Sequence, residues 1–439
     1  MNLSLPDQQK TNVRYFILVA LFIVTVLNVT DRATLSVAAP AMRKELGMDA
    51  MSLGIAFSAF GWTYTAFQIP GGWLLDKYGS RLVYGVGLFL WSFFTLAQGF
   101  IGSFAAPLTA LFIFRLLMGA AEAPAFPANS RLAAMWFPNH ERGFASAVFN
   151  SAQYVTVAIF VPIMAVGVAK LGWPALFVLT GLVGIMMSFC WFKVIRDPKN
   201  HPRVNQAELD YIQTGGGLAN LGEKRTKIKW AYVRALITNR LMVGVYLAQF
   251  CINTITWFFL TWFPTYLIEA KGMSILQVGL AASIPGIAGF GGGLLGGYWS
   301  DWLLRRGKTL TFARKTPIIL GLVCSSSIIL ANYVDSEVVV IFVLAVAFFA
   351  KGLGSLGWSV VGDTSPKEMV GLSGGIFNMI GNLSGIVTPL VIGYILKTTG
   401  SFNGALMYVG ALGFIGAMSY LFIVGEIKRV VLDTQEDDA

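Results

Sequence analysis

Four charged residues interrupt two of the most apolar stretches of the sequence. Asp31 and Arg32 lie in the first apolar stretch, and Arg115 and Glu122 lie in the fourth. A charged side chain at the depth of lipid hydrocarbon is costly, so it is usually paired, protonated or turned towards a water-filled cavity. A chain that keeps several such charges is predicted to move a charged solute across a membrane.

The first pair of charges is spaced to line one side of a helix. Asn28 and Arg32 are four residues apart and share a face, which Asp31 borders. A guanidinium stays charged and offers a planar pair of donors that fits a carboxylate. Burial favours the protonated form of a carboxylic acid, so Asp31 could load and release a proton. The alternative is a static ion pair that only orients the helix.

The second pair lies on one helical face, two turns apart. Pro124 and Pro127 follow Glu122 and are expected to loosen the helix there. We expect Glu122 to be a second protonatable carboxylate near a substrate, with Arg115 balancing its charge or acting in gating. A buried salt bridge between helices is the alternative.

Lys351 is a fifth charge, about midway along the apolar stretch 337–360. It is predicted to contact a substrate or to form an ion pair, whereas the alternative is a side chain that reaches the membrane edge. If Arg32 and Lys351 both face one cavity, the two cations would suit a diacid better than a monoacid.

Composition agrees with a membrane protein. Of 439 residues, 56% are hydrophobic and 12% are charged, whereas a soluble domain carries about 25% charged residues. The three cysteines lie in apolar stretches and the two histidines in predicted loops, so no disulfide framework or metal site is expected. No nucleophile, histidine and acid are grouped as in a hydrolase, so we expect neither an enzyme nor a cofactor.

Twelve apolar segments are about long enough to cross a bilayer as helices. They cover residues 15–38, 52–73, 83–103, 107–129, 144–166, 175–195, 241–265, 277–299, 316–333, 337–360, 373–396 and 405–425. A long polar connection divides them into six and six. The predicted organisation is therefore a six-helix bundle at 1–195, a central loop at 196–240 and a second bundle at 241–439.

Positive charge predicts the orientation of these segments. Most of the 32 Lys and Arg residues fall on the side of both termini and the central loop. Cytoplasmic loops of membrane proteins carry this excess, so both termini are expected in the cytoplasm. The net charge of +10 then reports topology and gives no reason to expect nucleic acid.

A short motif recurs in both halves. Gly72 and Asp76 follow the second segment, and Gly297 and Asp301 follow the eighth. The first copy fits G-x-L-x-D-[RK]-x-G-x-[RK] at Gly72, Leu74, Asp76, Lys77, Gly79 and Arg81. This motif resembles the cytoplasmic loop signature of the major facilitator superfamily.

A closer resemblance extends along nearly the whole chain. It is to the bacterial sugar-acid transporters of the anion:cation symporter family, especially those for glucarate and galactarate. The stretches that carry it are 31–40, 57–81, 121–131, 136–143, 257–267, 313–318 and 374–382.

The resemblance implies an all-α membrane fold of twelve helices in two pseudo-symmetric six-helix bundles. It implies a monomer in the bacterial inner membrane that imports an organic anion with protons by alternating access. It assigns proton coupling to Asp31 and Glu122, and gating on the cytoplasmic side to the motif residues and Asp301. The residues favoured for substrate binding are Arg32, Tyr64, Gln153, Trp358 and Asn378, with Lys351 as the second cation.

Other functions remain open at this point. A galactonate or hexuronate symporter would need only one cation for the substrate carboxylate. An organic-phosphate antiporter would be expected to use two arginines and no protonatable carboxylates, so Asp31 and Glu122 count against it. A transporter-like sensor would signal through 196–240, which is short for a partner domain.

Overall fold

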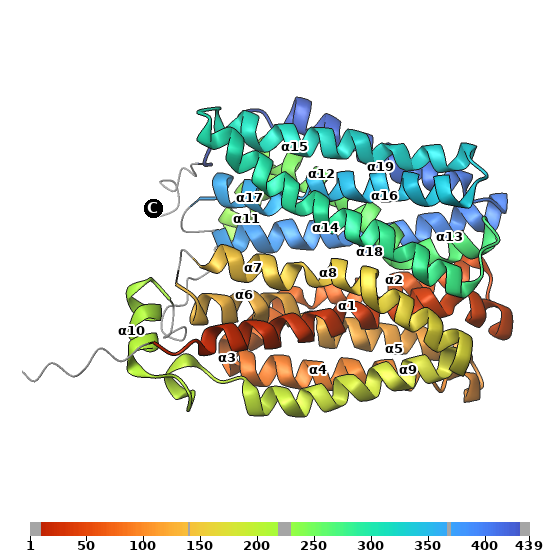
Figure 1. Cartoon of the computed structure of the whole chain (residues 1–439), viewed down its shortest axis with the longest axis horizontal. Helices are drawn as coiled ribbons and strands as arrows, with labels where there is room; N and C mark the ends of the chain where they lie inside the picture. Colours follow the sequence, from red (N-terminus) through yellow and green to blue (C-terminus); the bar gives the residue numbers. More distant parts are fainter. Residues whose placement is uncertain (1–9, 139–140, 218–229, 367–369, 431–439) are drawn as a thin grey trace, which may run out of the picture.

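The computed structural model describes residues 10–138, 141–217, 230–366 and 370–430, and every regular element in these ranges is helical. Figure 1 shows long helices running side by side along the longest axis of the molecule. Helices from the first half of the sequence fill one side of the view and those from the second half fill the other. The predicted all-α fold of two bundles is confirmed.

The helices account for twelve crossing segments. Ten are long and apolar enough to span a membrane. One of these, 144–194, contains two crossings, because the chain reverses at Gly172, whose φ of 81° favours glycine. A further crossing is formed by α2 and α3 together, which are separated at Phe67.

The first half contains the elements that surround the four buried charges. They are α1 (Val13–Leu46), α2 (Ala50–Ala66), α3 (Gln68–Tyr78), α4 (Ser80–Gln98), η1 (Ile101–Ser103), α5 (Pro107–Glu122), α6 (Ala125–Trp136), α7 (Arg142–Asn150), α8 (Ala152–Val155), the π-helical η2 (Thr156–Phe160) and α9 (Val161–Val194).

The second half repeats this arrangement after a linker. The linker carries η3 (Pro198–Asn200), α10 (Gln206–Thr214) and α11 (Trp230–Thr238). The crossing elements are α12 (Arg240–Thr261), α13 (Phe263–Glu269), α14 (Ile275–Arg305), α15 (Leu310–Ser325), η4 (Ser326–Tyr333), α16 (Glu337–Leu353), α17 (Gly357–Thr364), α18 (Val370–Thr399), α19 (Asn403–Met418) and η6 (Ser419–Ile423).

Several crossings are broken near the middle, where charged side chains lie. As predicted, the helix is interrupted after Glu122: α5 ends there and α6 begins at Ala125. Pro124 has no N–H to donate, so the regular hydrogen bonding cannot continue through it. Lys351 lies two residues before the end of α16, next to a second break at 354–356.

Apolar packing between the two halves is concentrated at one end. A large buried cluster combines Leu53 and Phe57 of α2 with Phe258, Phe263 and other residues of the second half. In Figure 1, α2 and α13 lie towards the end opposite α10 and α11, which is the end of the termini. Nearer the termini each half has its own buried cluster, although Trp257 of α12 also packs into that of the first half.

Polar contacts strengthen the joint at the end opposite the termini. Arg43 pairs with Glu269, and Lys397 Nζ lies 3.1 Å from Asp49 Oδ2. Ser36 Oγ also donates a hydrogen bond of 2.6 Å to the carbonyl of Thr261. Each contact joins one half to the other, so this end is closed.

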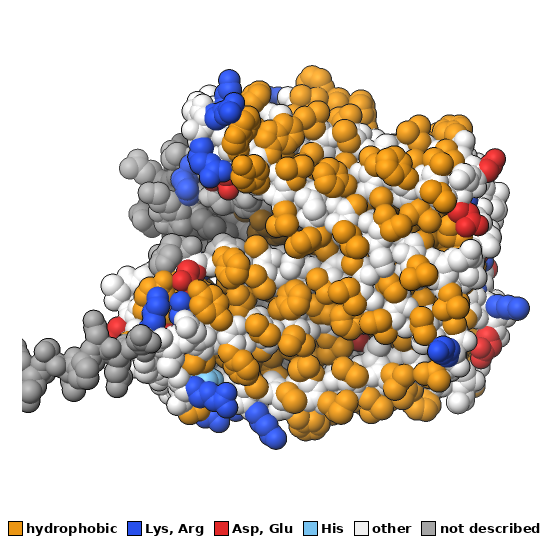
Figure 2. All heavy atoms as spheres, viewed as in Figure 1, with side chains coloured by type: hydrophobic (Ala, Val, Ile, Leu, Met, Phe, Trp, Pro, Cys, Tyr) orange, Lys and Arg blue, Asp and Glu red, His pale blue; other side chains and the backbone are white. Residues whose placement is uncertain are grey.

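The surface matches the requirements of a bilayer. Figure 2 shows hydrophobic side chains over the middle of the visible face, with Lys and Arg gathered mainly near the end that carries the termini. Exposed apolar residues such as Ile69, Leu280 and Phe422 are unfavourable in water and suit contact with lipid.

The linker helix α10 is fastened to the start of α1. Glu208 is fully buried and accepts hydrogen bonds from Thr11 Oγ1 at 2.6 Å and from the Val13 amide at 3.1 Å. Asn12 makes no side-chain cap for α1, so this carboxylate satisfies amides at the helix N-terminus instead. Sequence analysis predicted a polar connection here but neither α10 nor this contact.

Candidate functional site

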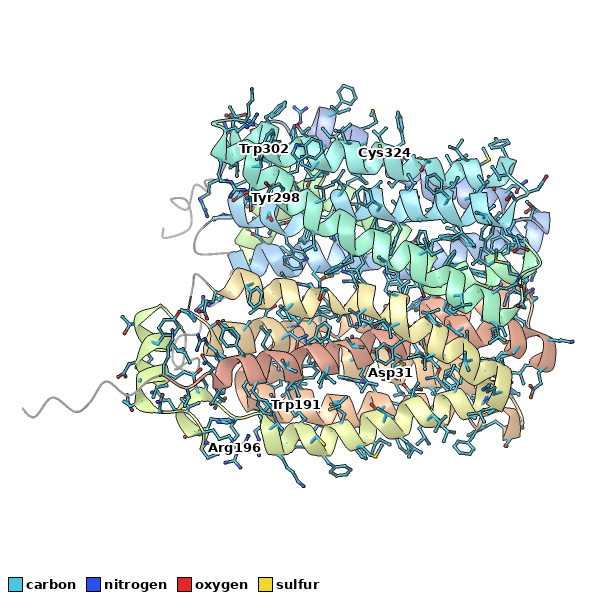
Figure 3. All side chains as sticks on the ribbon, viewed as in Figure 1. Asp31, Trp191, Arg196, Tyr298, Trp302 and Cys324 are labelled. Carbon is cyan, nitrogen blue, oxygen red and sulfur yellow. The ribbon has the colours of Figure 1, made fainter. Side chains whose placement is uncertain are left out.

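The four charges predicted to be functional lie together inside the first half. Asp31 and Arg32 come from α1, while Arg115 and Glu122 come from α5. Their exposed fractions are 1%, 8%, 1% and 0% respectively. Figure 3 shows Asp31 about midway between the two ends of the bundle. The cluster is therefore at the depth where hydrocarbon would surround the outer surface.

Arg32 and Glu122 form a buried ion pair between α1 and α5. Arg32 Nε donates to Glu122 Oε1, and the guanidinium carbon lies 4.6 Å from the centre of the Tyr64 ring. Arg32 Nη2 and Glu122 Oε2 are buried without a hydrogen-bond partner of good geometry among the described residues. Both members of the pair therefore retain capacity to bind another polar group.

Asp31 bonds to α4 and takes no part in this ion pair. Its Oδ2 accepts a hydrogen bond of 3.1 Å from Trp91 Nε1 of α4, while Oδ1 has no partner in the described part of the chain. The static Asp31–Arg32 ion pair considered as an alternative is therefore not formed. A buried salt bridge between helices was the alternative role expected for Arg115 and Glu122. Such a bridge is present, and it joins Glu122 to Arg32.

Arg115 is buried without a carboxylate at ion-pair distance among the described residues. Its nearest polar contact is the sulfur of Met118, 3.8 Å from Nη1, and its guanidinium lies 5.3 Å from the Phe60 ring centre. Arg115 is close to Asp31, Arg32 and Glu122 and contributes positive charge to the cluster. It can balance that cluster without binding one member directly.

Lys351 lies between the two halves, as a cation without a paired carboxylate among the described residues. It is 4% exposed, and Nζ lies 5.4 Å from the Tyr154 ring centre and 5.3 Å from that of Phe348. Tyr154 belongs to the first half and Phe348 to the second. A buried ammonium held mainly by aromatic faces is poorly neutralised, so it favours an incoming anion.

Asn378 and Tyr64 are linked through a residue that sequence analysis did not single out. Asn378 Nδ2 donates a hydrogen bond of 3.2 Å to Gln68 Oε1, across the two halves. Gln68 lies one turn after Tyr64, which is 2% exposed and stacked on Phe60. The four-residue spacing between Tyr64 and Gln68 is the sequence signal that could have identified Gln68.

Gln153 and Trp358 are less closely tied to the charged cluster. Gln153 is half-buried and its amide donates to the Asn150 carbonyl at 3.3 Å. Trp358 is 52% exposed on α17 and packs edge-on against Phe377 at 5.0 Å. Neither side chain makes a hydrogen bond or ion pair with Arg32 or Glu122, so their roles stay predictions.

The repeated motif lies at the end that carries the termini. Gly79 adopts a φ of 80° between α3 and α4, and Arg81 Nη2 donates 2.6 Å to the Phe192 carbonyl. Lys77 lies over the Trp73 ring. The side chain of Asp76 lies outside the described part of the structure.

In the second copy of the motif, Asp301 lies 3.5 Å from Arg314, which also pairs with Asp363 at 2.9 Å. In each half, residues of the motif therefore contact neighbouring helices. The first copy of the motif begins at Gly72.

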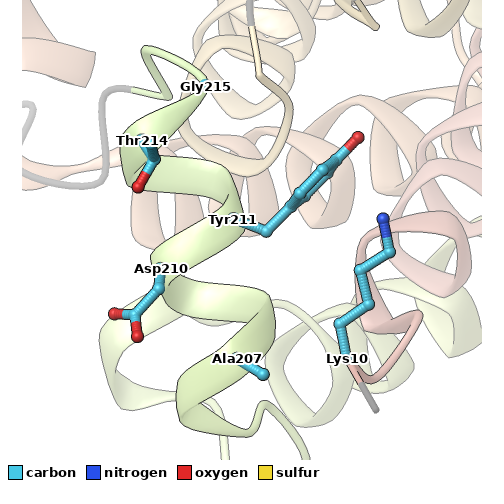
Figure 4. A pocket seen from close by; sticks show the side chains of 6 residues that line it. All are labelled: Lys10, Ala207, Asp210, Tyr211, Thr214 and Gly215. Carbon is cyan, nitrogen blue, oxygen red and sulfur yellow. The ribbon is translucent and has the colours of Figure 1, made fainter. Parts of the chain in front are cut away.

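A surface pocket beside α10 is separate from this chemistry. Figure 4 shows Lys10 facing Tyr211, and the ammonium lies 3.6 Å from the ring centre. The pocket is shallow and is lined by Lys10, Ala207, Asp210, Tyr211, Thr214 and Gly215. We place the candidate site at the buried charges, because the pocket touches none of them.

Known proteins resemble this chain over nearly its full length. Residues 21–349 match the family model described as Major Facilitator Superfamily. Proteins named "Probable galactarate/D-glucarate transporter" from Bacillus subtilis (strain 168) and Escherichia coli (strain K12) are each 53% identical to it. The first alignment covers 99% of this chain and 96% of the relative, and the second covers 97% and 96%.

Another relative and a solved structure are also similar to this chain. The "D-galactonate transporter" of Escherichia coli O6:H1 is 44% identical, over 95% of this chain and 97% of the relative. The crystal structure of a D-xylose-proton symporter superposes with a TM-score of 0.72 at 16% identity, over 94% of this chain and 98% of that one. At that identity, the structural likeness concerns the fold alone.

Proposed function

Because the chain belongs to the major facilitator superfamily of membrane transporters, we propose that it imports galactarate or D-glucarate together with protons. The names of its full-length relatives support this substrate class. The observation that carries the proposal is the buried Arg32–Glu122 pair, in which one cation and one carboxylate still have hydrogen-bonding capacity. The chain is a transporter and not an enzyme.

The orientation follows from the excess of positive charge near the termini. We place both termini and the 196–240 loop in the cytoplasm, between bundles at 1–195 and 241–439. The closed end, with Arg43, Glu269, Asp49 and Lys397, then faces outward. In this arrangement the described conformation is closed to the outside of the cell.

Competition for Arg32 couples the substrate to a proton. A substrate carboxylate that binds the guanidinium competes with Glu122 for the same donors. A carboxylate left in a buried site without its cation is strongly disfavoured, so it takes up a proton. Substrate binding and proton binding at Glu122 therefore favour each other.

Asp31 supplies a second proton-binding group. It is 1% exposed, and its hydrogen bond among the described residues comes from the neutral Trp91 indole. Each negative charge moved into a cell that is negative inside costs about 2.3 kcal/mol per 100 mV. A dianion therefore needs bound protons to enter efficiently, and two buried acids can carry them.

Lys351 accounts for the preference for a diacid. A six-carbon aldarate is about 7–8 Å long by ordinary bond geometry. One carboxylate can bind Arg32 of the first half while the other reaches towards Lys351 of the second half. Galactonate is the second candidate, since a relative is named a D-galactonate transporter, but it would leave Lys351 without an anion.

The test of function is uptake by purified protein in lipid vesicles. Labelled D-glucarate should accumulate when the outside is acidic and should not accumulate when an ionophore collapses the proton gradient. Unlabelled galactarate should compete better than galactonate or glucuronate. Preference for a monoacid would exclude the diacid assignment, and gradient-independent exchange with phosphate would indicate an antiporter.

Replacing Lys351 should reduce discrimination between diacids and monoacids. In Lys351→Gln, affinity for D-glucarate should fall about tenfold and that for galactonate less than threefold, because only the diacid loses a charged contact. Competition binding on the purified variant measures both. Equal losses for the two acids would show that Lys351 acts through structure alone; Lys428→Gln, an exposed lysine, is the control.

The outward-facing closure should weaken when one of its ion pairs is removed. An exposed ion pair contributes up to about 1 kcal/mol, so Glu269→Gln should raise the population open to the outside by up to about fivefold. Ser36→Cys, in a chain whose three native cysteines are replaced by serine, reports this opening. Ser36 is 1% exposed when the end is closed.

The measurement is the rate of labelling by a maleimide that cannot cross membranes. Glu426→Gln is the matched control, because its pair with Lys428 lies within the second half. Unchanged labelling in Glu269→Gln would exclude a gating role for that pair.

Hydrogen bonds from Ser52, and then Lys397, hold the pKa of Asp49 at about 2. The Asp49–Lys397 pair therefore stays charged at physiological pH.

A further inference from the structure

We propose that Gln68 binds a hydroxyl group of the substrate and gives the transporter its selectivity for hydroxylated acids. This inference rests on the proposed function. Gln68 and Asn378 form an amide pair that spans the two halves.

The backbone positions Gln68 beside the charged cluster. Helix α2 ends at Ala66 and α3 begins at Gln68, so the side chain extends from a break in the crossing helix. Gln68 follows Tyr64 by one turn, or about 6 Å along the axis. Tyr64 contacts the Arg32 guanidinium, so Gln68 lies one turn from a residue that touches the expected carboxylate anchor.

The Gln68 amide is only half satisfied. Gln68 is 8% exposed and its Oε1 accepts from Asn378 Nδ2. Its buried Nε2 lies near the Tyr64 hydroxyl but makes no hydrogen bond of good geometry among the described residues. Leaving a buried polar group unpaired costs roughly 1–3 kcal/mol. Asn378 turns its Nδ2 towards Gln68, and its Oδ1 accepts instead from Asn382 Nδ2 at 3.0 Å. Gln68 is therefore the open end of a chain of three amides.

The Gln68–Asn378 hydrogen bond is not needed merely to hold the two halves together. The halves are already joined by apolar packing and ion pairs at the outward end, whereas their buried clusters are largely separate near the termini. One neutral hydrogen bond adds little to that closure. A free amide atom next to an anion anchor is instead suited to a neutral polar group of the same ligand.

The chemistry of the amide indicates a hydroxyl group. An amide offers both a donor and an acceptor without net charge, as a hydroxyl does. A site built to hydrogen-bond a hydroxyl rejects an analogue that lacks it, because the site's buried polar groups are then left unpaired. D-Glucarate and adipate are both six-carbon diacids, but only D-glucarate carries hydroxyls.

The experiment compares these two acids on the full-length purified protein. In Gln68→Met, which keeps the side-chain length and removes the amide, D-glucarate binding should weaken about tenfold and adipate binding less than twofold. Gln68→Asn should recover part of the loss, since it restores an amide. Gln68→Leu serves if the Met variant does not fold, and Gln213→Leu, on the exposed face of α10, is the control.

Each outcome bears on Gln68. A fall in the ratio of D-glucarate to adipate affinity, with rescue by Asn, supports hydroxyl recognition. Equal weakening of both acids, or no change in either, overturns it. Failure of the wild-type protein to bind any aldarate would instead reject the proposed substrate. In that case Gln68 is tested with galactonate and hexanoate, two six-carbon monoacids of which only galactonate carries hydroxyls.

Discussion

Uphill accumulation of D-glucarate is expected to disappear in the Glu122→Gln variant, while exchange across the membrane persists. Glutamine resembles the protonated form of Glu122, so the variant can still bind substrate at Arg32 but cannot release a proton. The accumulation ratio under an inward proton gradient should fall to about one, the value for an uncoupled carrier. Counterflow, in which internal substrate drives uptake of label, should continue at a rate near that of the wild type.

The two assays together separate coupling from damage. A variant that fails both has lost binding or folding, whereas loss of accumulation alone identifies proton coupling. Asp31→Asn should show the same separation if both acids carry protons. Glu337→Gln, at the exposed start of α16, is the matched control and should accumulate normally. Normal accumulation in both Asp31→Asn and Glu122→Gln would rule out the proton-relay assignment.

Most of the fold was predictable because the bilayer imposes simple rules. A crossing helix must be apolar over about 20 residues, so the segments can be recognised without knowledge of their partners. The rule does not specify where a helix is interrupted. A proline follows the breaks after Glu122, at Phe67 and at Trp262, namely Pro124, Pro70 and Pro264. The break at 354–356 has no adjacent proline and depends on packing against neighbouring helices.

The candidate site was predictable in its residue types but not in its pairing. Charges in apolar stretches identified Asp31, Arg32, Arg115 and Glu122 without any structure. The seven-residue spacing of Arg115 and Glu122 on one helix suggested that Arg115 balances the charge of Glu122. The observed partner is Arg32, which is 90 residues away in sequence. Such a pairing depends on the packing of α1 against neighbouring helices and cannot be derived from helical periodicity.

Gln68 illustrates a second limit. An amide in a crossing helix is most simply explained by hydrogen bonding between helices. Gln68 does make such a bond, with Asn378, and only its buried Nε2, which makes no hydrogen bond of good geometry in the described part of the chain, distinguishes it from such a residue. The anchoring of α10 by Glu208 is similar, because a polar linker gives no indication that one carboxylate will cap α1.

Substituting Arg32 with lysine should weaken substrate binding more than tenfold, equivalent to about 1.4 kcal/mol. The guanidinium donates through Nε to Glu122, keeps Nη2 free, and lies 4.6 Å from the Tyr64 ring centre and 4.9 Å from that of Phe60. An ammonium group keeps the charge but lacks the planar set of donors that can serve two carboxylates in turn.

Calorimetric titration of purified Arg32→Lys with D-glucarate measures this loss, and a thermal melt without substrate verifies folding. Arg115→Lys is the matched comparison: Arg115 is also buried in this cluster, but it is not paired with Glu122. It should therefore lose less affinity than Arg32→Lys. If Arg32→Lys binds almost normally, Arg32 is structural, and competition with Glu122 for its guanidinium cannot be the origin of coupling.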